Sequence, residues 1–491
     1  MRKNCYICCR KHELININQK YIIMKQRIFS CLLAVLLNLS AMAEVKYVFY
    51  FIGDGMGVNQ INVTETYLAA LKGRIGFEPL LMSSLPVVGM VNTYSATNGV
   101  TDSAAGGTAL ATGKKTKNGA IGVLKDLETP CYSIAQWAKN SGKAVGVATS
   151  VAITHATPAS FFGHQPNRNM YYELGKDLCK SGFDFFGGSD FHRPYVKEGE
   201  PSLHEQAQAA GYTIVKGYKE YTKKGRQAEK CILVQSDKAN EKLGSDQIPY
   251  ALDQTKDDLT LEQIVRAGIN FLSSKNTDGF FFEVEGGMID WACHSNDIGN
   301  CINEVIDFDK AIKVAYEFYE QHPDETIIVI SADHETGGLV MGVGPYEIHT
   351  DLLKYQRKSI NELDRILTNM YKKAPKKFTW TVVEKTLKEE MGFGAGIELK
   401  DEQKERLENR WKKIEKAMAD NGKVEDRIGD LCETTKHILS EVAMISWASG
   451  GHSNGYVPVY AVGPGTEIFQ GRIDNIEIAP GMAKIAGYKI E

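Results

Sequence analysis

Five short apolar runs constrain the fold of this chain more than any other feature. They occupy residues 45–52, 144–149, 280–284, 326–331 and 457–462. Runs of this length flanked by glycine, histidine or carboxylate residues are typical of buried strands, and we interpret all five as parallel strands. Helical patterns lie between them, at residues 132–139, 261–272 and 304–319. Strands that alternate with helices predict an α/β fold with a mostly parallel central sheet and helices on both faces.

The composition is that of a globular protein without a basic surface. The 491 residues are 43% hydrophobic and 24% charged, and the formal net charge is −4. This balance argues against a polyanion-binding protein, so we expect no nucleic-acid binding. The length is consistent with about three domains or, equally, with one large α/β core that carries insertions.

The N-terminal segment has the pattern of a secretory signal peptide. A basic stretch at residues 24–27 precedes an apolar run at 28–39 and the sequence Ala-Met-Ala at 41–43. We interpret residues 24–43 as a signal peptide and residues 1–23 as an upstream extension. A retained membrane anchor is the alternative, but the apolar run is short for a bilayer, so we expect no stable membrane association after cleavage. The protein would then be periplasmic or secreted and begin near Glu44.

Residues 351–443 differ from the rest of the chain because they are dense in Lys and Glu, with Leu and Ile at helical spacing. We predict a helical insertion here, within a domain that spans residues 44–491. A charge run of this kind is usually a solvated helix face. Because acidic and basic residues are mixed along it, we do not interpret it as a nucleic-acid site.

Chemistry-bearing side chains lie next to the predicted strands. Asp54, Glu285 and Asp333 follow three of the runs, Thr157 follows a fourth, and His452 precedes the last. A single Asp after a strand is often only a helix N-cap. Open α/β sheets, however, bind ligands at the carboxyl ends of their strands, and the repetition at separate strand ends predicts that these residues converge on one crevice.

Two further patterns indicate a metal site. Asp290 and His294 are four residues apart, so on a helix they project from one face and provide half of a zinc site. Taken alone, such a pair is more often a surface contact. His334 and His452, each in a glycine-rich setting, supply further imidazoles.

Ser103 is the candidate nucleophile. It follows Asp102 and precedes a run of small residues at 104–109 that can open a helix. A serine at a helix N-terminus lies beside backbone N–H groups that favour an anion, although a plain N-cap serine is the competing interpretation. No G-x-S-x-G elbow surrounds Ser103, so an α/β-hydrolase triad is not indicated.

At this point the chain resembles the alkaline phosphatase family. The resemblance runs in order from about residue 46 to 465. Each motif is weak alone, but the ordered set is specific. The motifs are residues 54–57, 101–105, 114–120, 155–159, 167–169, 284–290, 332–338 and 451–452.

The resemblance implies two zinc ions and one magnesium ion per chain. For the zinc ions it implies the ligand sets Asp290, His294 and His452, and Asp54, Asp333 and His334. For magnesium it implies Asp54, Thr157 and Glu285. It also implies that Ser103 becomes phosphorylated, that Arg168 binds the phosphate and that Asp102 orients Arg168.

Positions 155 and 291 vary within the family. Where enteric bacterial members have Asp and Lys, this chain has His155 and Trp291, a pair that resembles some marine and cold-adapted members. Both side chains are expected near the bound substrate.

The implied function is hydrolysis of phosphate monoesters, small molecules, by an enzyme that is often a homodimer in this family. The first alternative is a phosphodiesterase or phosphonate hydrolase of the same superfamily, although Arg168 would occupy the space of a second ester group. A sulfatase is disfavoured because no Cys/Ser-x-Pro-x-Arg signature surrounds Ser103. A secreted metal-binding protein without catalysis is the alternative from a different class.

Overall fold

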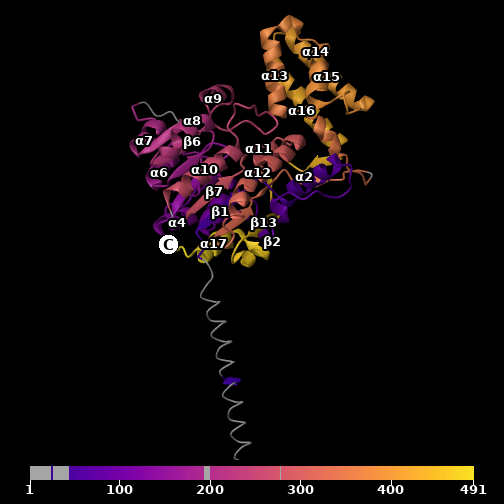
Figure 1. The fold of residues 1–491 in the computed structure, drawn as a ribbon. Helices are drawn as coiled ribbons and strands as arrows, with labels where there is room; N and C mark the ends of the chain where they lie inside the picture. The colour runs from indigo at the N-terminus through magenta and orange to yellow at the C-terminus, as the bar shows by residue number, and fades with distance from the viewer. Residues whose placement is uncertain (1–23, 26–43, 193–198, 277, 345, 491) are drawn as a thin grey trace, which may run out of the picture. The chain divides into compact units, whose positions relative to one another are not determined.

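The centre of the fold is a ten-stranded sheet that joins segments from the whole chain (Figure 1). Its strands, from edge to edge, are β14 (Gly471–Asp474), β2 (Val87–Asn92), β13 (Val457–Val462), β8 (Thr326–Ser331), β1 (Tyr47–Ile52), β7 (Phe280–Glu285), β3 (Ala144–Thr149), β4 (Phe185–Gly187), β6 (Lys230–Val234) and β5 (Tyr212–Lys216). The five apolar runs form β1, β3, β7, β8 and β13, which confirms that they are strands.

This computed structural model describes residues 24–25, 44–192, 199–276, 278–344 and 346–490. The predicted upstream extension (1–23) and most of the predicted signal peptide (24–43) lie outside the described residues. Among the helices that are described, none has the length and apolar character needed to span a membrane. The six cysteines from Cys131 to Cys432 are free thiols.

The central strands end at the same level. β1 lies between β7 and β8, and Ile52 pairs with Glu285 on one side and with Ser331 on the other. Thr149, at the end of β3, also pairs with Glu285. Because these strands are parallel, the turns that follow them leave from one edge of the sheet. This edge carries the candidate site.

β13 runs in the opposite direction, so the prediction of five parallel strands is wrong for this one. It pairs antiparallel with β8 and with β2. The chain reaches β13 through β12 (His452–Ser453), which pairs with β9 (Glu335–Thr336) just beyond the carboxyl end of β8. The chain therefore enters the sheet at the edge where its neighbours leave it. For this reason His452, which precedes β13, lies at the same edge as Asp333.

Helices cover both faces of the sheet. α10 (Leu261–Lys275) and α12 (Ile298–Tyr319) pack on each other and on β3 and β8, whereas α4 (Ile134–Asn140) packs on β3, β7 and α17 (Ile478–Ala486). Side chains such as Phe271 and Trp137 are fully buried between these layers. The α/β fold with a mostly parallel sheet is thus confirmed.

Helices also fill the region predicted as an insertion. They are α13 (Ile360–Lys373), α14 (Trp380–Met391), α15 (Asp401–Ala419) and α16 (Val424–Val442), and they share a hydrophobic core of their own that includes Leu363, Trp411 and Leu431. Asp297, at the start of α12, holds this region: it accepts hydrogen bonds from Gln356 Nε2 at 2.6 Å and from the Ile360 backbone at 2.7 Å.

Candidate active site

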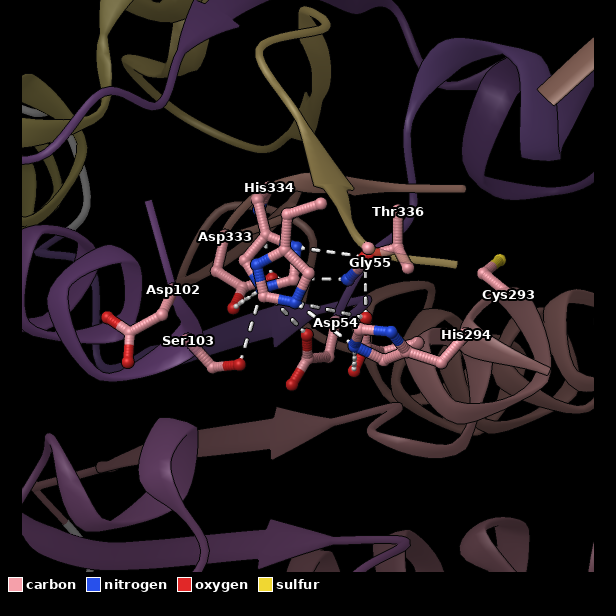
Figure 2. Close-up of polar contacts among 12 residues, drawn as sticks. Asp54, Gly55, Asp102, Ser103, Cys293, His294, Asp333, His334 and Thr336 are labelled. Carbon is pink, nitrogen blue, oxygen red and sulfur yellow. Dashed lines mark hydrogen bonds and ion pairs between the residues drawn. The ribbon is translucent and has the colours of Figure 1, made fainter. Parts of the chain in front are cut away.

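The turns at the carboxyl edge gather carboxylate and imidazole side chains from distant parts of the sequence (Figure 2). They are Asp54 after β1, Glu285 at the end of β7, Asp290 and His294 on α11 (Met288–His294), Asp333 and His334 after β8, and His452 in β12. The predicted convergence of these residues is therefore observed in the geometry. Three overlapping groups of candidate metal ligands lie among these residues and His155.

The first group is Asp290, His294 and His452, whose ligand atoms lie within 4.8 Å of one another. His294 Nε2 is 3.2 Å from Asp290 Oδ2 and 3.1 Å from His452 Nε2. His294 Nδ1 is 2.6 Å from the Gly450 carbonyl oxygen, and His452 Nδ1 is 2.9 Å from that of Thr101. Because a carbonyl can only accept, each Nδ1 carries a proton, and each Nε2 is the ring nitrogen that faces the group.

The second group is Asp54, Asp290 and His334. His334 Nε2 lies 3.4 Å from Asp54 Oδ1 and 3.1 Å from Asp333 Oδ2. All four side chains are buried. The expected set for this site contained Asp54, Asp333 and His334. The structure keeps these three together and adds Asp290, which faces both the first and the second group.

The third group is Asp54, Glu285 and His155. Thr157 Oγ1 donates a hydrogen bond to Asp54 Oδ2 at 3.3 Å, and the Thr149 hydroxyl donates to the Glu285 carboxylate. Like the second group, it combines two carboxylates with one imidazole, and the two hydroxyls add further oxygen atoms beside it. Because Asp54 also belongs to the second group, the three groups form one continuous row.

Burial and crowding set the charge state of this row. Burial, with the neighbouring carboxylates, holds the pKa of Asp54 and that of Asp333 well above the usual range, and burial raises the pKa of Glu285 to about 7. Burial also acts to raise the pKa of Asp290, but its hydrogen bond to His294 and the other imidazoles outweigh that effect and keep the pKa low. A bound cation would relieve the repulsion among these carboxylates.

Three carboxylate oxygens in the row accept no hydrogen bond from any residue that the structure describes: Asp54 Oδ1, Glu285 Oε1 and Asp333 Oδ2. Buried acceptors without a partner are costly, and a metal ion satisfies them. The donor sets also fit the implied metals. Mixed imidazole and carboxylate ligands suit zinc, and hard oxygen donors suit magnesium.

Ser103 is the first residue of α3 (Ser103–Thr112), and its side chain points to the row (Figure 2). Its Oγ atom lies 3.3 Å from His334 Nε2. Asp102 is the N-cap, because its Oδ1 atom accepts a hydrogen bond from the Ala105 backbone at 3.1 Å. The interpretation of Ser103 as a plain N-cap serine is therefore wrong. Its hydroxyl lies at the positive end of the α3 dipole, which favours an anionic oxygen.

Asp102 also holds Arg168. Arg168 Nη1 donates to Asp102 Oδ2 at 3.1 Å, and the Gly119 backbone donates to both Asp102 oxygens at 3.0 Å. The Arg168 backbone N–H in turn donates to the Gly119 carbonyl at 2.7 Å. The contact with Asp102 engages one of the five guanidinium N–H donors, and the planar fork suits bidentate binding of an oxyanion.

His155, a member of the third group, contacts Trp291. Their rings meet edge to face, with centroids 5.8 Å apart and an interplanar angle of 74°. Burial, followed by the charge of Arg168, lowers the pKa of His155 to about 3, so this imidazole is neutral at any physiological pH. Trp291 also packs against the main hydrophobic core.

Sequence reasoning missed Thr336, which joins two of the groups. Its Oγ1 atom donates to Asp290 Oδ1 at 2.5 Å and lies 3.2 Å from His334 Nδ1. The only signal was its position two residues after His334. Thr149 was also missed, although it ends a predicted strand.

The fold and the site together define an α/β enzyme with a serine hydroxyl beside a row of candidate metal ligands at the carboxyl edge of its sheet. Residues 45–488 match the family described as alkaline phosphatase, and the chain belongs to this family. This confirms the resemblance found in the sequence. The protein is a phosphatase of a metal-dependent family that acts on phosphate monoesters.

Known relatives match most of the chain. Alkaline phosphatase 3 of Bacillus subtilis (strain 168) is 32% identical over 463 residues, which cover 91% of this chain and 90% of the relative. Alkaline phosphatase 4 of the same organism is 30% identical, with 90% and 89% covered. Among solved structures, the cold-active alkaline phosphatase of Shewanella sp. has a TM-score of 0.74 and 30% identity, over 90% of this chain and 99% of that one.

Proposed function

We propose that the protein hydrolyses phosphate monoesters through a phosphoserine at Ser103 and releases inorganic phosphate and an alcohol. The observation that carries this proposal is the position of Ser103 Oγ, 3.3 Å from His334 Nε2 in the second group of candidate ligands. Arg168, held by Asp102, which directly precedes Ser103, adds a guanidinium for the phosphoryl oxygens.

The proposal includes two zinc ions and one magnesium ion per chain. Asp290, His294 and His452 would hold the first zinc ion, Asp54, Asp333 and His334 the second, and Asp54, Thr157 and Glu285 the magnesium ion. When bound, the zinc ions would supply Lewis-acid stabilisation of the attacking and leaving oxygens, with magnesium balancing the charge of Asp54 and Glu285.

The chain's own residues then perform two displacements. Ser103 Oγ loses its proton and forms a bond to phosphorus as the bond to the alcohol oxygen breaks, and the alcohol oxygen takes up a proton and leaves. A water oxygen next loses a proton and forms a bond to phosphorus, the bond to Ser103 Oγ breaks, Ser103 Oγ takes up a proton, and inorganic phosphate leaves. Throughout, Arg168 binds phosphoryl oxygens while Asp102 fixes its orientation.

The test compares p-nitrophenyl phosphate with the bis(p-nitrophenyl) diester and with p-nitrophenyl sulfate. We expect the monoester to have the highest kcat/KM. Arg168→Ala should lower kcat/KM for the monoester by about 10- to 100-fold, the scale of a lost charge-assisted contact, and should not lower it for the diester. The exposed Arg472 serves as a control, because Arg472→Ala removes the same charge away from the row. A higher kcat/KM for the diester would identify a phosphodiesterase instead.

We expect Trp291→Lys to strengthen inhibition by inorganic phosphate. The neutral pair His155 and Trp291 adds no positive charge beside the phosphate, whereas a Lys at position 291 would. A charge separated by solvent is worth about 1 kcal/mol, so the inhibition constant should fall several-fold. If phosphate release limits turnover, kcat should fall with it.

Packing is the competing explanation for Trp291, and Trp291→Phe is the matched control. Phe keeps an aromatic ring against His155 without a charge. We expect it to leave the inhibition constant unchanged. If the inhibition constant for phosphate were unchanged both in Trp291→Lys and in the double variant that also carries His155→Asp, the charge argument would be excluded. Packing would then be the role of Trp291.

A periplasmic or secreted location, without stable membrane association, belongs to this proposal and rests on the signal-peptide pattern of residues 24–43. The substrates would be small phosphate monoesters, and a homodimer remains a prediction from the family.

A further inference from the structure

A cleft of about 510 Å³ lies between the helical region and the core, apart from the row of candidate metal ligands. We call it the α15–α16 cleft. Its walls include Arg406, Arg410 and Lys413 from α15, His437 from α16, and Asn296 and Trp447 from the core.

The cleft is positively charged because the face of α15 that lines it carries basic side chains. Arg406, Arg410 and Lys413 are spaced by four and three residues, so they lie on one face of the helix. Glu441 is the acidic residue in the lining, and both of its oxygens accept hydrogen bonds from Arg406 Nη1, at 2.7 and 2.9 Å. Within the described part of the chain, no carboxylate forms an ion pair with Arg410 or Lys413.

The polar groups of the cleft suit a phosphate-type oxyanion. Arg410 Nε donates to Thr434 Oγ1 at 2.9 Å, which fixes the guanidinium and leaves its Nη atoms outside that contact. Ser446 also lines the cleft, whereas the Thr434 hydroxyl donates to the Asp430 carbonyl at 3.0 Å and Ser440 Oγ is buried. Arginine and lysine side chains are the groups that bind phosphate in proteins.

The cleft borders the first group of candidate metal ligands. Asn296 lies two residues after His294, and its Nδ2 atom donates to the Ser449 carbonyl at 2.9 Å. The next carbonyl, that of Gly450, accepts the hydrogen bond from His294 Nδ1. One pair of loops therefore forms both the cleft wall and the support of His294, whose side chain is 38% exposed.

We propose that the α15–α16 cleft is a subsite for a phosphate group, supplied either by the leaving group of a doubly phosphorylated substrate or by free inorganic phosphate. This inference rests on the proposed function at Ser103. In the first case, the preferred substrates are monoesters whose alcohol carries a second phosphate.

The first experiment uses alkanediol bisphosphates of increasing chain length. Each is paired with the hydroxyalkyl phosphate of the same chain, which lacks only the distal phosphate. The ratio of the two kcat/KM values should peak at one chain length, mainly through KM. Arg410→Ala and Lys413→Ala should each lower the peak by about tenfold, the scale of a partly exposed charge-assisted contact.

Lys412→Ala is the matched control, because Lys412 is an exposed neighbour on α15 outside the cleft lining. It should leave the ratio unchanged.

The second experiment counts inorganic phosphate bound to the metal-loaded enzyme by calorimetry. Two bound phosphates per chain, one of which is lost in the Arg410→Ala/Lys413→Ala double variant, would support the subsite. If the ratio of kcat/KM values then did not vary with chain length, the ligand of the subsite would be free phosphate.

A flat series together with an unchanged phosphate count in the double variant would overturn the subsite. That result would leave the proposed function intact, because the hydroxyalkyl phosphates would still be hydrolysed. Failure to hydrolyse any monoester would refute the proposed function instead.

Discussion

Ser103→Ala should lower kcat/KM for p-nitrophenyl phosphate by at least about a thousandfold and leave the protein folded. The substitution removes Oγ, the atom proposed to form the bond to phosphorus. It does not remove the helix cap, because Asp102 Oδ1 accepts the capping hydrogen bond from Ala105. Alanine is also well tolerated at a helical position. Steady-state kinetics and the melting temperature measure these two results, and covalent incorporation of labelled phosphate at low pH should be lost.

Ser133 provides the opposite control. It caps α4, where its Oγ accepts from the Gln136 backbone at 3.2 Å and donates to the Phe161 carbonyl at 2.6 Å. Ser133→Ala should lower the free energy of unfolding by about 1 kcal/mol and leave turnover nearly unchanged. If Ser103→Ala still became covalently phosphorylated, another residue would be the nucleophile.

The strands at the centre of the sheet were predictable because they are buried on both faces. β1, β3, β7 and β8 are continuous apolar runs for this reason. Their common carboxyl edge follows from parallel pairing, so the convergence of Asp54, Glu285 and Asp333 could be predicted without coordinates.

The direction of β13 could not be predicted, because an apolar run has the same pattern in a parallel and in an antiparallel strand. Strands away from the centre of the sheet were not predicted, for other reasons. β4 has only three residues, and β2 exposes Val88 and Met90 between buried positions. The pattern of a short or half-exposed strand is too weak to separate from a loop.

Details within the site depend on contacts between residues far apart in sequence. The shared position of Asp290 between two groups, and its link to His334 through Thr336, follow from the packing of α11 against β9. The basic face of α15 in the cleft could likewise not be predicted from the sequence. The sequence shows alternating Lys, Arg and Glu, but only the partner helix α16 determines which face lines the cleft.

Chelation of bound metal should abolish activity, and zinc with magnesium should restore it. The physical reason is the row of buried carboxylates. Burial and mutual repulsion hold the pKa of Asp54 and that of Asp333 high, so without cations these side chains take up protons or repel each other. Elemental analysis of the purified enzyme should give two zinc ions and one magnesium ion per chain.

Asp290→Ala sharpens this test because Asp290 faces both the first and the second group. We expect it to lose at least one zinc ion per chain and to reduce kcat/KM by at least about a hundredfold. Asp307 is the matched control: it is buried on α12, and Asp307→Asn should retain the full metal content and activity. Equal metal loss in both variants would indicate a general effect on folding. Full activity in a thoroughly demetallated sample would refute the metal-dependent mechanism, because the carboxylate row would then work without a cation.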